Sequence, residues 1–286
     1  MEGGERTLMF GHEFMRNAFL AGTFVALACG LVGYFVVLRA QVFAGDALSH
    51  VAFTGALAAA AAGIDLRIGL FAITILVALG MGLAGDRARP DDVVIGSFFA
   101  WILGLGALFL SIYTTSSSGS GDGTAGVRVL FGSIFGLSAS EARLAALLGA
   151  AAVALTLVIA RPLLFSSVDV DVAEAKGLKV RTIGLVFLGV LGLTAAEATQ
   201  AVGALLLLGL LAAPAGAAHR LTANPYKGLA LSAALAILAT WGGLTLSYLV
   251  PDLPPSSMII LLAVAIYLAA SLATQRARKP KLESVR

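Results

Sequence analysis

Nine stretches of mostly apolar residues follow one another along the 286-residue chain, separated by short polar segments. A helix of ~20 apolar residues is long enough to cross the hydrocarbon core of a bilayer. Charged residue types make up only 12% of the chain, about half their usual share in a soluble domain. These features exclude a soluble enzyme and a disordered chain, and they predict an all-α integral membrane protein. The candidate spans are residues 17–38, 46–63, 67–85, 92–113, 140–161, 182–199, 201–218, 228–249 and 256–273.

The number of spans depends on how the stretch from 182 to 218 is divided. We divide it at Ala198-Thr199-Gln200, where polarity peaks, whereas one long helix would reduce the count to eight. The chain contains 33 glycines, and small residues let transmembrane helices approach closely. We therefore expect residues 1–286 to form a single, tightly packed transmembrane domain. The one cysteine, Cys29, excludes a disulfide scaffold and is expected to be buried and inert.

The positions of lysine and arginine predict the orientation, because these residues favour cytoplasmic loops. With nine spans and a cytoplasmic C-terminus, 14 of the 19 basic residues lie inside. This predicts a multi-pass protein of the cytoplasmic membrane with its N-terminus outside and a basic cytoplasmic tail at 274–286. The net charge of +3 then reflects basic loops and not nucleic-acid binding. The five basic residues outside are Arg6, Arg16, Arg67, Arg128 and Arg143.

Four segments outside the spans have distinct characters. Residues 1–16 form a polar N-terminal segment, and residues 114–126 form a Ser/Gly-rich loop that we expect to be flexible and extracellular. Residues 130–138 are apolar but too short to span, which predicts an interfacial or re-entrant piece. The charged stretch 166–181 is long enough for one short helix, capped by Asp169 or Asp171 and closed by Gly177. It is interpreted as a docking surface or an ordinary solvated loop.

Asp46 and His50 are the strongest candidates for function, since ionisable residues within spans are costly. They lie four residues apart, so a helix places them on one face, and Thr54 continues that stripe. Their oxygen and nitrogen atoms suit a divalent first-row metal. The alternative is that Asp46 only caps the helix and His50 only bonds a neighbouring helix. Two ligands are too few for a tight site, so more ligands must come from elsewhere.

Two further ionisable residues lie near span ends. Glu197, with Gln200 nearby, is expected near the outer end of its span as a third metal ligand, an outer gate, or a carboxylate reaching the interface. His219 precedes Arg220 and is expected to be a solvated boundary residue. The chain contains no G-x-x-x-x-G-K-[ST], G-x-S-x-G or H-E-x-x-H motif. If the chain takes part in ATP-driven transport, the ATPase is therefore another polypeptide, and a membrane-embedded enzyme is disfavoured.

Four stretches together make the chain resemble the permease family of zinc and manganese ABC importers, from about Leu38 to Leu272. Any one of them is weak, but their order and spacing are specific. The resemblance implies a type II ABC importer-like permease fold. The stretches are Val37-Leu38-Arg39 with Gly45-Asp46-Ala47-Leu48-Ser49-His50, Leu130-Phe131-Gly132-Ser133-Ile134, residues 171–178 (DVAEAKGL), and Gln200-Ala201-Val202-Gly203 with Ala213-Pro214-Ala215.

The resemblance also implies partners. These are a second copy of the chain, a cytoplasmic ATPase dimer and an extracytoplasmic metal-binding protein. It identifies residues 169–179 as the helix that couples the permease to the ATPase, and it places Asp46 and His50 on the family's strongest polar motif. Glu197 and the long 114–126 loop depart from the family pattern. The coupling residues implied are Asp171, Ala173, Glu174, Lys176 and Gly177.

The sequence therefore predicts a permease subunit that passes manganese, zinc or iron inward as cargo, with no permanently bound cofactor. The absence of thiolate ligands mildly disfavours zinc and leaves manganese open. Two alternatives remain at this point. One is a proton-coupled secondary metal transporter with Asp46, His50 and Glu197 as its relay. The other is a permease for a metal chelate, which needs a wide pathway and does not depend on His50.

Overall fold

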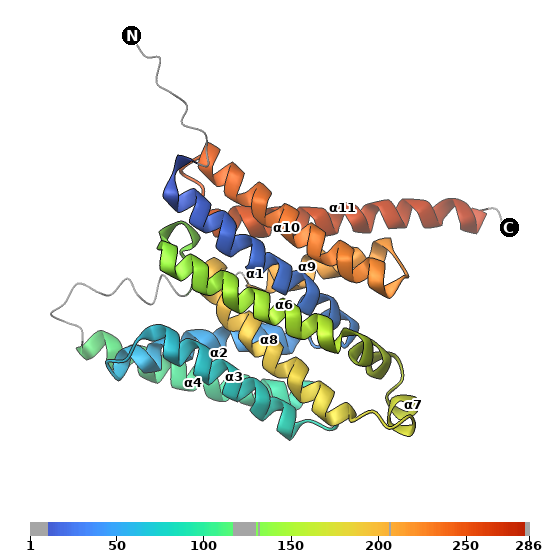
Figure 1. Cartoon of the computed structure of the whole chain (residues 1–286), viewed down its shortest axis with the longest axis horizontal. Coiled ribbons are helices and arrows are strands. Elements are labelled where there is room, and N and C mark those ends of the chain that lie inside the picture. The colour runs from blue at the N-terminus through green and yellow to red at the C-terminus, as the bar shows by residue number, and fades with distance from the viewer. Residues whose placement is uncertain (1–10, 117–129, 131, 206, 284–286) are drawn as a thin grey trace, which may run out of the picture.

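The computed structural model describes residues 11–116, 130, 132–205 and 207–283, and in these residues the regular structure is helical, without a β-strand. The helices run side by side in one bundle, and α7 lies at one end of it (Figure 1). The helices are α1 (Glu13–Leu38), α2 (Val42–Ala61), α3 (Leu66–Ala84), α4 (Asp92–Ser116), η2 (Ile134–Gly136), α6 (Ala139–Val168), α7 (Val170–Ala175), α8 (Val180–Val202), α9 (Leu207–Leu221), α10 (Pro225–Leu249) and α11 (Pro255–Glu283).

Within the described residues, eight helices are long and apolar enough to cross a membrane, and α9, with 15 residues, is shorter. The stretch from 182 to 218 is not one long helix, which confirms its division into two. The break follows Gly203 and not Thr199, because Gly203 has a φ of +101° that ends α8. A left-handed backbone of this kind favours glycine. The second stretch therefore starts and ends later than residues 201–218.

Three segments outside the predicted spans differ from expectation. Helix α1 already begins at Glu13, so part of the polar segment 1–16 is helical, while residues 1–10 lie outside the described residues. Helix α4 extends to Ser116, and the rest of the 114–126 loop also lies outside them. Helix α11 continues to Glu283, through most of the basic tail 274–286. Long apolar helices thus continue into flanking polar sequence.

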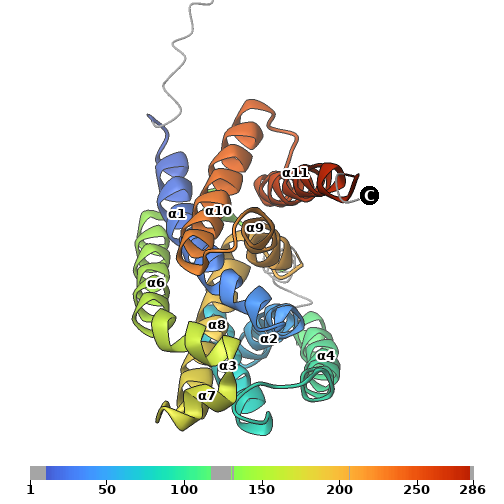
Figure 2. The ribbon, with the colours of Figure 1, turned by 90° about the vertical axis from the view of Figure 1, so that its right-hand side faces the viewer.

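Helix α1 lies in the middle of the bundle, where it contacts α6, α8, α9 and α10 (Figures 1 and 2). Most of its span is buried (72%), as are the spans of α2 and α8 (67% each). In contrast, only 17% of the α4 and α11 spans is buried. The bundle thus has an inner layer, which includes α2, and outer helices with apolar faces that need lipid or a partner.

Glycines allow the inner helices to approach closely. A Cβ atom on Gly33 of α1 would lie 2.0 Å from the carbonyl oxygen of Leu211 on α9. Between α2 and α3, a Cβ on Gly55 or on Gly69 would lie 2.5 or 2.2 Å from the other residue's carbonyl oxygen. These contacts leave no room for a side chain, which confirms the close packing expected from the glycine content.

The short apolar segment 130–138 packs against the break between α8 and α9. The carbonyl of Leu130 accepts a hydrogen bond from the Leu205 amide (3.3 Å). Gly132 has a φ of +74°, and a Cβ there would lie 2.4 Å from the carbonyl carbon of Val202. Ile134 in η2 is fully buried. Two of the stretches that carry the family resemblance, far apart in sequence, therefore meet in space.

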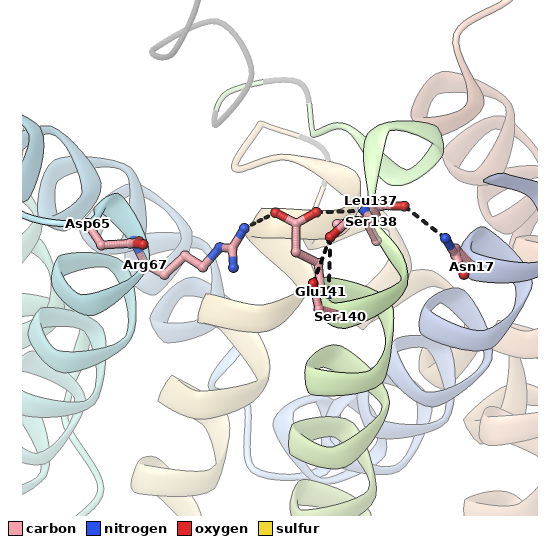
Figure 3. A network of polar contacts seen from close by, with 7 residues as sticks. All are labelled: Asn17, Asp65, Arg67, Leu137, Ser138, Ser140 and Glu141. Carbon is pink, nitrogen blue, oxygen red and sulfur yellow. Dashed lines mark hydrogen bonds and ion pairs between the residues drawn. The ribbon is translucent and has the colours of Figure 1, made fainter. Parts of the chain in front are cut away.

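A polar network ties three helices together at the end of the bundle opposite α7 (Figure 3). Glu141 and Ser138 form a capping box at the start of α6. The Glu141 carboxylate also pairs with Arg67 at the start of α3, and Asn17 of α1 donates to the carbonyl of Leu137 (3.2 Å). This network connects the start of α6 to α3 through Arg67 and to α1 through Asn17.

Candidate functional site

Asp46 and His50 lie one turn apart on the inner helix α2, and both are half-buried. They belong to a stripe at helical spacing with Phe43, which is 39% exposed, and half-buried Phe53. Most other residues from 44 to 57 are buried. Between residues 43 and 57, the partly exposed side chains of α2 therefore all belong to this stripe.

The neighbours of the pair are mostly apolar. The ring of Phe99 on α4 lies 5.2 Å from the His50 ring and 5.9 Å from the Phe43 ring, measured between centroids. Among the described residues, the Asp46 and His50 side chains have no hydrogen-bond or ion-pair partner. Helix α2 starts at Val42, so Asp46 does not cap it, and this alternative is wrong. The two polar groups remain available to a ligand.

Thr54 does not continue the polar stripe. Its side chain is 2% exposed, and its hydroxyl donates to the carbonyl of Ile102 on α4 (3.2 Å). Thr54 thus attaches α4, which carries Phe99, to α2. Thr54 therefore helps to position Phe99 beside Asp46 and His50, and it does not add a third polar side chain to them.

The single chain does not bring a third ligand to the pair. In the part of the chain that the structure describes, no three His, Cys, Asp or Glu side chains are grouped so that they could hold a metal ion. Glu197 lies on α8 and is 2% exposed, and neither of its carboxylate oxygens has a hydrogen-bond partner there. Its neighbours include buried Cys29 on α1 and the backbone of Gly149 on α6. Among the described residues, Asp46 and His50 therefore have no third side chain of these types beside them.

His219 packs against α1, so the expectation of a merely solvated boundary residue is wrong. Its ring stacks on Tyr34 with centroids 4.2 Å apart. Its Nε2 atom lies 3.1 Å from the Tyr34 carbonyl oxygen, within hydrogen-bond distance. The residue therefore helps to join α9 to α1.

Helix α7 has the two ends predicted from its sequence, although it is shorter than residues 169–179. Asp169 caps it by accepting a hydrogen bond from the Val172 amide (2.9 Å). Gly177 closes it with a φ of +83°. The Gly177 and Leu178 amides donate to the carbonyls of Glu174 and Ala173, a common end for a helix.

The connection between α3 and α4 holds α7 against the bundle. Arg87 contacts Asp171 (2.8 Å) and Glu174 (3.3 Å). The hydrogen bond to Asp171, together with the charge of Glu174, raises the pKa of Arg87 above its ordinary value. Two carboxylates predicted to contact a partner are thus engaged within the chain. The sequence did not indicate this pairing, because Arg87 lies 84 residues before Asp171.

A buried arginine joins the turn before α2 to the end of α6. Arg39 is 3% exposed, and it donates to Gln41 (3.2 Å) and to Ser167 (3.3 Å). Arg89 donates to the Arg39 carbonyl oxygen (3.4 Å). Burial and the neighbouring Arg89 lower the pKa of Arg39 to about 10. These contacts connect the α7 end of α6 with the start of the helix that carries Asp46 and His50.

Long apolar helices, a polar pair on an inner helix and a charged helix outside the spans together define a membrane-embedded transport subunit. A model of the ABC 3 transport family matches residues 11–274. The chain belongs to this family. This confirms the predicted resemblance.

Relatives cover nearly the whole chain. It is 28% identical to the manganese transport system membrane protein MntC of Listeria innocua, over 91% of each chain. It is 31% identical to the "Probable iron transport system membrane protein" of Haemophilus influenzae, over 90% of this chain and 93% of that one. The solved structure of PsaBC from Streptococcus pneumoniae, in complex with Fab, matches with a TM-score of 0.77, 25% identity and 92% coverage of each chain. The predicted permease fold and the transport role, as opposed to an enzymatic one, are confirmed.

Proposed function

We propose that this chain is the permease subunit of an ATP-driven importer for a divalent first-row transition metal. One observation carries the proposal. The Asp46–His50 pair is partly exposed on a helix that is mostly buried, without a polar partner among the described residues. The family and the names of the manganese and iron transport relatives support it. Manganese, iron and zinc remain the candidate cargoes.

The site is completed by a second copy of the chain. Two copies related by a two-fold axis present the same surface to each other, so two Asp46–His50 pairs face across the axis and supply four ligands. Carboxylate suits manganese, and imidazole suits iron and zinc. A site of four such ligands without thiolates binds the ion transiently, which lets the ion leave again. Phe43 and Phe99 line the site with apolar surface beside the ligands.

Helix α7 is the contact with the cytoplasmic ATPase. Ala173 packs into the bundle, whereas Val172 and Ala175 are exposed and form the docking surface. In this proposal Asp171 and Glu174 hold the helix through Arg87. The α7 end then lies in the cytoplasm with the C-terminus, and a binding protein delivers the ion at the opposite end. Motion of α7 is transmitted to α2 through the contacts of Arg87 with α7 and of Arg89 with Arg39, which lies in the turn between α1 and α2.

The test is radioactive manganese uptake by proteoliposomes that contain the chain and its ATPase, with zinc and iron as competitors. Asp46→Ala and His50→Ala should each abolish uptake while size-exclusion chromatography shows normal assembly. Asp92→Ala changes an exposed aspartate at the start of α4 and should leave uptake unchanged. Near-normal uptake by the Asp46 and His50 variants would remove the site. Uptake driven by a pH gradient in the chain without an ATPase would replace the proposal with secondary transport.

A further inference from the structure

An apolar groove lies between the last turns of α6, the segment after α7 and the start of α10. Its volume is about 660 Å³, within the range of ~300–1,000 Å³ typical of ligand pockets. Its walls include Leu164, Phe165 and Val168 from α6, Leu178 after α7 and Tyr226 from α10. Helix α6 is a candidate membrane span, and α7 follows it outside the span. The groove therefore crosses the boundary between membrane and water.

Arg161 lies at the membrane side of the groove. It is exposed on α6, one turn after Leu157 (53% exposed) and close to Val158 (77% exposed). Arg161 thus projects from the surface that faces lipid. In the described residues it forms no ion pair, although a charged group within a span is costly without a partner.

Lys176 lies at the water side of the same groove, with its Nζ atom 5.2 Å from the centre of the Phe165 ring. The nearby acidic residues are engaged elsewhere, since Asp171 and Glu174 pair with Arg87 and Asp169 caps α7. No acidic residue lines the groove. Two cations therefore line an apolar groove that has no acidic residue in its lining, and among the described residues neither cation forms an ion pair.

We propose that this groove binds an anionic phospholipid, with its phosphate between Arg161 and Lys176 and an acyl chain along Leu164 and Phe165. Guanidinium groups bind phosphate through paired hydrogen bonds, and basic pockets at the edge of helical bundles suit lipid headgroups. Tyr226 offers an amphipathic ring at the interface level. A zwitterionic lipid fits less well, because its headgroup adds a positive charge beside two cations. The proposal depends on the membrane location alone and not on the transported ion.

The test is native mass spectrometry of the purified full chain with phosphatidylglycerol or phosphatidylcholine of identical acyl chains. Phosphatidylglycerol should bind at least about tenfold more tightly, and the double variant Arg161→Gln/Lys176→Gln should lose this preference. Arg143→Gln removes an exposed arginine at the other end of α6 and should keep it. Equal binding of the two lipids, or the same loss in Arg143→Gln, would overturn the proposal.

A second measurement asks whether a protein covers the groove instead. Val168 is 78% exposed, so Val168→Cys can be labelled with a maleimide in vesicles. Added phosphatidylglycerol should slow labelling of the permease, with or without its ATPase. Protection that appears only when the ATPase or a second copy of the chain binds would assign the groove to a protein and refute lipid binding.

Discussion

Gly33 offers a sharp test of the packing between α1 and α9. In Gly33→Ala, the new Cβ would lie 2.0 Å from the Leu211 carbonyl oxygen, whereas ordinary contacts begin at 3.4 Å. Because the obstacle is backbone and not the end of a flexible side chain, α9 has to move by more than 1 ångström, about the difference between these values. Overpacking of this kind costs about 1–3 kcal/mol, and the higher helix propensity of alanine returns at most about 1 kcal/mol.

The assay is thermal unfolding of the purified chain in detergent, followed by size-exclusion chromatography. The matched control is Gly104→Ala on the outer helix α4, where an added Cβ meets nothing within 4 Å. That control gains propensity without a clash, so its Tm should stay equal or rise, while the Tm of Gly33→Ala should fall by several degrees. Equal Tm values for the two variants would show that α1 and α9 do not approach as closely as described.

Three further substitutions test the elements around the site. Gly177→Leu places a side chain at a φ of +83°, which strains the end of α7, and it should uncouple ATP hydrolysis from uptake. An unchanged ratio of ATP hydrolysed to ion transported would count against α7 as the coupling helix. Arg87→Ala removes the ion pairs with Asp171 and Glu174 and should lower uptake per ATP hydrolysed while assembly stays normal. An unchanged uptake per ATP would exclude a role for these ion pairs in coupling. Thr54→Val removes the hydrogen bond to α4 and should lower stability by about 1 kcal/mol, measurable as a lower Tm; an unchanged Tm would refute this bond.

The sequence by itself determined the features that depend on neighbouring residues. Long apolar stretches predicted the membrane helices because crossing a bilayer needs about 20 such residues. Asp169 and Gly177 predicted both ends of α7, since caps act within one helical turn. The spacing of Asp46 and His50 placed them on one face of α2 for the same local reason.

Only the tertiary structure decided which distant residues meet. Arg87 contacts Asp171, which lies 84 positions later in the sequence. The Thr54 hydroxyl donates a hydrogen bond to α4, and His219 stacks on Tyr34. It also buried Glu197 on α8 without grouping it with Asp46 and His50 among the described residues, because the helix faces are set by close packing between helices and not by the spacing within one. Apolar helices in a membrane carry little pattern that shows which neighbour each face contacts, since lipid and protein interior are equally apolar.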